Sequence, residues 1–472
     1  MKLTIQRSGM VVALLAGLAC RGKQAPTVSR DQLRSPQDWL REESISLLRD
    51  YVRIPTRSEF EAEEEGALFL KRFFDCAGIE AEVVCPAPKR CNVLARLPGK
   101  TRRGSLLLLS HIDVASVFPE AWKEARPFEG DFKNGYLYGR GVFDTKSLAI
   151  AQALAMRHLK EHGIVPESDV LFLAEADEEW TQRWGSRWLL AHRPEWFEGV
   201  TAVLNEGGTT EVVVRSVRFW GLETLQAGCA WAELESPKAE SLRELAQRWP
   251  RLHSPVVEPH PHVVEGFGLL ANELHPPLTD LLRHLDRVTH DPSELALLPD
   301  RFGAFLEARV EWLDPVRPPN EPSAKFHTIF YVFTPPGMDT APYVAQILAD
   351  AARSSIHAIS VFQSGPTTAS PYPAPVTDAL KLVTNARYPG VPFGPMPLIG
   401  GFTTSILFQQ HGFAAYGFSP VAMNRFDAAR RHGNDERVYL RDYLNGVDLY
   451  KDFLEEFAFF SWNKTSASKP RT

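Results

Sequence analysis

Short apolar runs alternate with segments of helical periodicity from about residue 90 onward. The strand candidates are almost wholly apolar, and apolar residues recur at helical spacing in the segments between them, such as 147–163. Strands that read this way belong to a mostly parallel sheet that helices cover on both faces. The pattern predicts an α/β fold with strands at 92–97, 105–112, 168–176 and 200–206.

The pattern changes beyond about residue 215 and returns near the C-terminus. Proline-rich punctuation surrounds a long amphipathic stretch at 277–312, and a strand candidate follows at 326–333. The segment from about 378 then resumes the earlier alternation. We expect a smaller α+β unit, residues 216–363, inserted into a larger domain formed by residues 30–215 and 364–465.

The first twenty residues form a pattern of their own. Lys2 and Arg7 precede an apolar run that is too short to span a bilayer and that ends in small residues and Cys20. This is typical of a signal peptide, and "GLAC" resembles a bacterial lipoprotein processing site. The expectation is export to the periplasm or cell envelope with a lipid anchor at Cys20. The alternative is simple cleavage, which would release a soluble exported protein.

Composition narrows the choice of partners and cofactors. The 472 residues carry 52 basic and 58 acidic side chains, so there is no basic stripe for a nucleic acid to bind. Export would favour disulfides, and Cys85 and Cys91 could face each other across a hairpin, although the spacing also allows lone thiols. No C-x-x-C pair indicates a thiolate zinc site. The acidic run Glu59–Glu65 is predicted to be a solvated helix start.

Candidate chemistry collects where the predicted strands end. The strand at 105–112 leads into "SHID", with His111 and Asp113, and the next two close on Glu175–Glu179 and on Glu206. A glycine-flanked turn supplies Asp144. Carboxylates gathered at one sheet edge would repel each other unless cations neutralised them. The pattern therefore predicts one or two divalent metal ions.

The donor types narrow the kind of metal site. Histidine nitrogen with carboxylate oxygen and no thiolate suits zinc in a catalytic setting. His111 and Asp113 lie two residues apart on a strand, so they share a side, and Asp113 could orient a ligand histidine. A lone H-x-D or a glutamate pair is usually structural. The prediction therefore rests on the occurrence of all these residues together at the ends of successive strands. The "GRG" segment does not indicate nucleotide binding, because it lacks the G-x-G-x-x-G pattern.

The ordered motifs "SHIDV", "GYLYGRGVFDTK", "ADEEW", "LNEGG" and "RRHGNDERV" resemble the M20 family of dinuclear zinc peptidases and aminoacylases. They are most similar to its carboxypeptidase S and N-acyl amino acid hydrolase branch. The resemblance implies one zinc on His111 and Glu206, with Asp144 bridging to a second zinc on Glu179 and His432. It also implies Glu178 as general base, Asp113 as the residue orienting the histidine, and an inserted lid that often dimerises.

The chain departs from the family pattern in the predicted lid and in a late glycine motif. The lid segment "GHxS-P" reads "ELESP" here, with Glu233 near the histidine's place, and His253, His260 and His262 are weak substitutes. No cation precedes "PG" in "YVFTPPGMD". In "GGFTTSILF", Thr404 and Ile406 replace an aspartate and an arginine, which argues against strict selection of free α-carboxylates.

Two classes of function fit these observations. The first is a zinc hydrolase that cleaves an amide bond in small peptides or N-acyl amino acids by metal-activated water. The second is a catalytically impaired relative that keeps the metal and acts as a ligand-binding module, which the missing lid histidine motivates.

Overall fold

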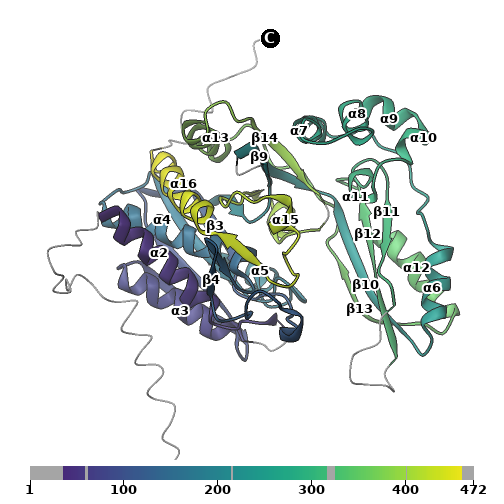
Figure 1. Cartoon of the computed structure of the whole chain (residues 1–472), viewed down its shortest axis with the longest axis horizontal. Coiled ribbons are helices and arrows are strands. Elements are labelled where there is room, and N and C mark those ends of the chain that lie inside the picture. Colours follow the sequence, from purple (N-terminus) through teal and green to yellow (C-terminus); the bar gives the residue numbers. More distant parts are fainter. Residues whose placement is uncertain (1–35, 59–61, 214–215, 316–324, 400, 460–472) are drawn as a thin grey trace, which may run out of the picture. The chain divides into compact units, whose positions relative to one another are not determined.

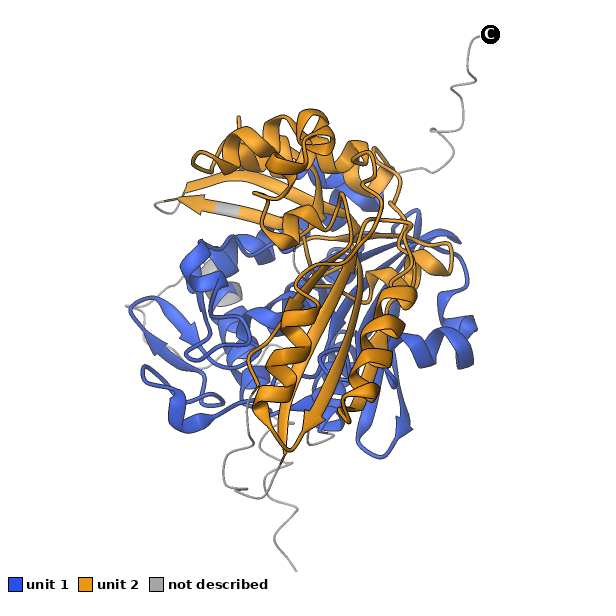
Figure 2. Ribbon diagram, turned by 90° about the vertical axis from the view of Figure 1, so that its right-hand side faces the viewer, with its two compact units in different colours: residues 1–204, 378–383, 419–472 blue, residues 205–377, 384–418 orange. Residues whose placement is uncertain are grey.

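The computed structural model describes residues 36–58, 62–213, 216–315, 325–399 and 401–459. They form two compact units (Figure 2). The first unit holds the chain up to Leu204 with 378–383 and 419 onward, and the second holds 205–377 and 384–418. The predicted signal peptide and Cys20 lie outside the described residues. No helix within the described ranges is long and apolar enough to cross a membrane.

The first unit is built on a sheet in which strand order is β1-β2-β6-β3-β7. Strands β6, β3 and β7 run parallel, whereas β1 and β2 are antiparallel to their neighbours. A small sheet, β16-β5-β4, lies in the same unit. The strands are β1 (Glu80–Ala87), β2 (Arg90–Leu97), β3 (Thr101–His111), β4 (Asp131–Lys133), β5 (Tyr136–Tyr138), β6 (Ser168–Glu175), β7 (Val200–Asn205) and β16 (Arg437–Tyr439).

Helices bury the apolar strands of this sheet. Helix α4 packs against β3 and β6, and α2 and α16 pack against α4 (Figure 1). All four leucines from Leu106 to Leu109 are fully buried, as their continuous apolar run predicts. The helices are α2 (Pro36–Val52), α3 (Glu63–Cys76), α4 (Ser147–Glu161), α5 (Ser186–His192), α15 (Arg425–Ala428) and α16 (Leu440–Ala458).

Two local features settle or correct expectations from the sequence. Cys85 and Cys91 form a disulfide across the β1–β2 hairpin, with an S–S distance of 2.07 Å. Helix α3 begins at Glu63, which was predicted to be solvated but has an exposed fraction of 0%. The prediction was wrong for this residue because the Arg90 guanidinium contacts its carboxylate inside the protein.

The second unit contains two β-sheet regions. In one, β9 pairs in parallel with β14 and antiparallel with β8 and β15. The other is a four-stranded antiparallel sheet of order β11-β12-β10-β13. The strands are β8 (Thr209–Val213), β9 (Ser216–Gln226), β10 (Gly228–Ser236), β11 (Arg309–Trp312), β12 (Phe326–Thr334), β13 (His357–Gln363), β14 (Phe393–Leu398) and β15 (Ala414–Gly417).

Helices α6 (Ala239–Arg248) and α12 (Ala341–Arg353) pack on the four-stranded sheet through a buried apolar cluster that includes Leu242 and Ile347. The amphipathic stretch at 277–312 is broken into short helices, and Pro292 and Pro299, which lack the N–H that a continuous helix needs, lie at two of the breaks. The remaining helices are α7 (Pro261–Ala271), α8 (Leu278–Arg283), α9 (Leu285–His290), α10 (Pro292–Leu295), α11 (Asp300–Gly303), α13 (Pro375–Arg387) and α14 (Ser405–Gln410).

The predicted α/β class is confirmed, with parallel strands at the centre and helices packed on them. The second compact unit begins at Asn205. The narrower lid of residues 216–363 stays a prediction.

Candidate metal centre

His111 ends strand β3 and is held in a defined orientation. Its ring Nδ1 lies 2.8 Å from the Asp113 carbonyl oxygen, and its Nε2 lies 3.0 Å from Asp144 Oδ1. A carbonyl can only accept, so Nδ1 is the donor and the neutral ring turns a lone pair toward Asp144. A carboxylate oxygen cannot donate to that lone pair. A cation placed between the two atoms would bind both of them.

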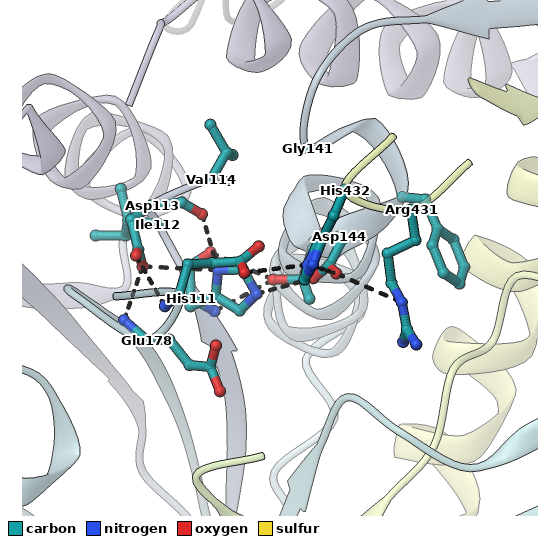
Figure 3. Close-up of polar contacts among 12 residues, drawn as sticks. His111, Ile112, Asp113, Val114, Gly141, Asp144, Glu178, Arg431 and His432 are labelled. Carbon is teal, nitrogen blue, oxygen red and sulfur yellow. Dashed lines mark hydrogen bonds and ion pairs between the residues drawn. The ribbon is translucent and has the colours of Figure 1, made fainter. Parts of the chain in front are cut away.

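Asp144 stands between two imidazole rings. Its Oδ2 lies 2.9 Å from His432 Nε2, while Oδ1 faces His111 (Figure 3). Glu179 Oε2 lies 3.1 Å from the same His432 nitrogen. Figure 3 shows Asp144 joined to both rings, with Glu178 projecting nearby. One carboxylate that faces a different histidine with each oxygen has the arrangement of a bridging ligand.

The ionisation of these groups follows from their contacts. Burial opposes the charge on Asp144, but the hydrogen bonds with His111 and His432 hold its pKa well below the usual range. Burial likewise opposes the charge on His432, but the hydrogen bonds with Asp144 and Glu179 raise its pKa to about 11. Asp144 and Glu179 together thus favour a positive charge on the His432 ring.

Asp113 ties the acidic loop after β6 to the end of β3. Its carboxylate accepts from the backbone N–H groups of Glu178 and Glu179, each at 3.0 Å, and from Ser58 Oγ at 2.6 Å. The same residue orients His111, although through its carbonyl rather than the carboxylate, which stands 3.7 Å from Nδ1. Asp113 therefore holds four other residues at once.

A buried ion pair joins the segments that carry Asp144 and His432. Arg140 Nη1 lies 2.7 Å from Glu436 Oε2, and Arg140 Nη2 donates to the His432 carbonyl at 3.0 Å. Glu436 also accepts from the backbone N–H groups of Gly141, Phe143 and Asp144. Both charges are buried and hydrogen-bonded, which is the condition under which a buried pair is tolerated.

The residues present fit a divalent metal. His111, Asp144 and Glu179 each offer a ligand atom within 4.8 Å of the others, and Glu178 also has a carboxylate oxygen within 4.8 Å of a His111 nitrogen. Glu179 Oε1 is buried and has no hydrogen-bond partner in the described part of the chain. Burial and repulsion by Asp144 raise the pKa of Glu179. A cation would satisfy both the orphan oxygen and the clustered charge.

The other acidic residues at the strand ends have different surroundings. Glu175 is buried and accepts from Ser186 N at 2.6 Å, and Asp177 accepts from three backbone N–H groups of its own turn. These two residues shape the loop. Glu206 follows β7 directly in the sequence and belongs to the second unit, so its ligand role stays a prediction.

In the second unit, the positions at which the chain departs from the family pattern have structural partners. Glu233 Oε1 on β10 lies 2.8 Å from Nδ1 of His327, which lies on β12. His260 Nδ1 accepts from His262 N at 3.2 Å and so caps helix α7. Thr404 receives a hydrogen bond from Asn205 Nδ2 at 3.4 Å.

Three contributors to this centre were not singled out from the sequence. In the sequence, Arg140 belongs to a glycine-flanked turn and Glu436 to the last motif, and neither these two residues nor Ser58 carries a predicted role. Each acts through contacts with residues far away in the sequence, as Arg140 and Glu436 do across 296 positions. The charges in "GRG" and "NDER" were the available signal.

Comparison with known proteins assigns the family. The model of peptidase family M20/M25/M40 matches residues 107–456, so the chain belongs to this family. It is a hydrolase of the M20 type, as its motifs predicted.

Individual relatives agree with this assignment. An N-fatty-acyl-amino acid synthase/hydrolase, PM20D1, from Xenopus tropicalis is 24% identical over 91% of this chain and 90% of its own. An M20 family metallo-carboxypeptidase from Sulfolobus solfataricus has a similar fold, with a TM-score of 0.67 and 15% identity over 89% of this chain and all of the other. A dinuclear metal-binding M20 peptidase from Bacillus subtilis has a TM-score of 0.51, with 13% identity over 89% of this chain and 98% of the other.

Proposed function

We propose that this protein hydrolyses the amide bond of N-acyl amino acids or small peptides with two zinc ions. His111 and Glu206 would hold one ion, Glu179 and His432 the other, and Asp144 would bridge them. The observation that carries the proposal is the position of Asp144, whose two oxygens face His111 and His432 at 3.0 and 2.9 Å. The Xenopus relative, which matches over most of both chains, supports an acyl amino acid as substrate.

Each residue has a defined task in this proposal. The bound metal would polarise the scissile carbonyl and lower the pKa of water. Glu178 accepts the proton of the attacking water and passes it to the departing nitrogen. Asp113 holds the backbone of Glu178 in place through the hydrogen bond at 3.0 Å. The Asp113 carbonyl keeps the His111 lone pair turned inward.

Metal content tests the proposal directly. We expect elemental analysis of the dialysed wild-type protein to give close to two zinc ions per chain, and His111→Asn and Asp144→Asn to lose metal. His158→Asn and Asp169→Asn are matched controls in the same unit, because both residues have ion partners away from the site, and they should keep it. A folded wild-type protein that binds no divalent metal would end the proposal.

The second candidate is a metal-binding protein without turnover. It is favoured by the Glu233–His327 pair, which occupies the region where relatives carry a lone lid histidine. This candidate predicts full metal content but no product from a mass-spectrometric screen of acyl amino acids and dipeptides. Export with a lipid anchor at Cys20 stays a proposal, which the mass of the mature protein would test.

A further inference from the structure

The second unit contains a buried polar chain that the proposed catalytic steps do not use. Glu223 and Gln226 lie on β9, and their exposed fractions are 1% and 0%. Gln226 Nε2 donates to Glu223 Oε1 and to Thr403 Oγ1, each at 2.7 Å. The Gln226 side-chain oxygen accepts from Thr403 N at 2.9 Å. Burying these three polar side chains costs free energy unless the hydrogen bonds between them are kept.

One end of this chain lies against the turn that follows Glu206. Gly207 and Gly208 have φ values of +118° and +72°, a region in which side chains are strained. A Cβ atom built on Gly207 or on Gly417 would overlap Glu223 Oε2. The Glu223 carboxyl group thus fills a hollow that glycine leaves open, directly beside the backbone of the Glu206 turn. Its Oε2 has no hydrogen-bond partner of standard geometry in the described chain.

The other end fixes the loop 401–405. The Gln226 side chain binds both the N–H and the hydroxyl of Thr403, so it clamps the backbone and the side chain of one residue. The same loop is tied to the Glu206 turn a second time, because Asn205 Nδ2 donates to Thr404 Oγ1 at 3.4 Å and to Ser405 Oγ at 3.2 Å. The Glu206 turn is therefore linked to this loop by the hydrogen bonds of Asn205 and by the close packing of Glu223 against Gly207.

We propose that Glu223 is a positioning residue for Glu206, and that Gln226 extends this support to the loop 401–405. The inference rests on the proposed function, in which Glu206 binds a metal ion. The alternative is that these polar residues only fill space in the core. An apolar side chain would fill that space with less desolvation, but an apolar side chain would not bind the Thr403 backbone.

Cobalt binding to the full chain separates these readings. After the metal is removed with a chelator, Co²⁺ is titrated back and followed by its visible absorption. We expect Glu223→Ala to bind one of two Co²⁺ ions roughly tenfold to a hundredfold more weakly, the usual effect of losing a residue that supports a ligand. The second ion, on Glu179 and His432, should bind with the wild-type affinity.

Thr403→Val should weaken the binding of the same ion, but by less than Glu223→Ala does, because this substitution leaves Glu223 in place. Thr328→Val is its matched control: Thr328 is also buried in the second unit, and its hydroxyl donates to the Leu313 carbonyl at 2.5 Å, away from this chain. Glutamine has nearly the same shape as glutamate and keeps an oxygen that can accept from Gln226 Nε2. Glu223→Gln should therefore retain both ions.

The outcomes distinguish the two proposals. A wild-type protein that binds fewer than two Co²⁺ ions contradicts the proposed function. A wild-type protein that binds two, with Glu223→Ala equal to it, overturns the positioning role alone. Should Glu223→Ala fail to fold by circular dichroism, Gln226→Met decides, since it keeps the volume and removes the hydrogen bonds. Wild-type affinity for both ions in that variant would also overturn the role.

Discussion

Glu178 and Glu179 are adjacent in the sequence but have different surroundings. The Glu179 carboxylate is 7% exposed and lies 3.1 Å from the His432 ring. Glu178 is held through its backbone by Asp113, while its carboxylate extends toward His111 (Figure 3). These surroundings match the proposed function, in which Glu179 would bind the metal and Glu178 would act as the base.

Replacing each glutamate by glutamine should separate these roles. We expect Glu178→Gln to keep two metal ions and to lose about 10²–10⁴-fold in kcat, the usual worth of a general base. Glu179→Gln should instead lose metal. Steady-state kinetics with elemental analysis on both variants measures this. Equal turnover by Glu178→Gln and the wild type would favour a different base.

Glu63 predicts a pH dependence of stability. Burial, followed by repulsion from Asp113, raises its pKa from 4.5 to about 7. The folded chain then holds a proton that the unfolded chain releases at lower pH. This proton on Glu63 stabilises the folded chain by ~3 kcal/mol in all. The stabilisation is fully present below about pH 4.5 and is lost as pH rises through 7.

Urea unfolding at pH 5 and pH 8 measures the effect. The free energy of unfolding of the wild type should fall relative to that of Glu63→Gln over this range. Glu64→Gln, an exposed neighbour in the same helical turn, serves as the control and should follow the wild type. Parallel pH profiles for all three proteins would contradict the raised pKa.

At the scale of elements, the Arg140–Glu436 pair links the turn before α4 to the loop before β16. Asp144 and His432, the ligands of the proposed metal centre, both lie on irregular backbone, so regular secondary structure alone does not fix their positions. The pair holds both backbones through five hydrogen bonds to N–H and carbonyl groups.

Glu436→Gln should therefore affect stability and metal binding together. Breaking a buried pair typically costs about 3–5 kcal/mol, and losing a supporting residue weakens metal binding roughly tenfold to a hundredfold. Glu167→Gln, which removes the exposed pair with Lys100, should cost under about 1 kcal/mol. Denaturant unfolding and Co²⁺ titration measure both effects. Unchanged Co²⁺ affinity in Glu436→Gln would limit the pair to a role in stability.

The sequence predicted the helices, the strands and the candidate ligands better than the residues that hold them in position. The leucines of β3 and the residue types at the strand ends identified the sheet and the ligand candidates, because strand periodicity and donor chemistry are local. Arg140, Glu223 and Glu63 could not be assigned in this way. Their roles come from partners that only the folded chain brings near, and "EFEAEEEG" reads as surface until Arg90 is placed beside it.

At the scale of the whole molecule, β13 offers a place for association. It is an outer strand of the four-stranded sheet, and within the described chain no strand pairs with its other side. Ile359 and Val361 on it are 49% and 47% exposed. An outer strand with apolar side chains can pair antiparallel with a second copy of itself.

We accordingly expect a homodimer in solution. Light scattering after size-exclusion chromatography should give twice the chain mass for the wild type and the chain mass for Ile359→Lys/Val361→Lys. Leu382→Lys, an equally exposed leucine on α13, is the matched control and should leave the mass doubled. A monomeric wild type would contradict the expectation.

His432 follows His111, Asp144 and Glu179 in the sequence after a long interval. During synthesis on the ribosome, the first three residues emerge well before the fourth. Under the proposed function, a translation product that stops short of His432 lacks one of the metal ligands. Such fragments should therefore not hydrolyse amide bonds.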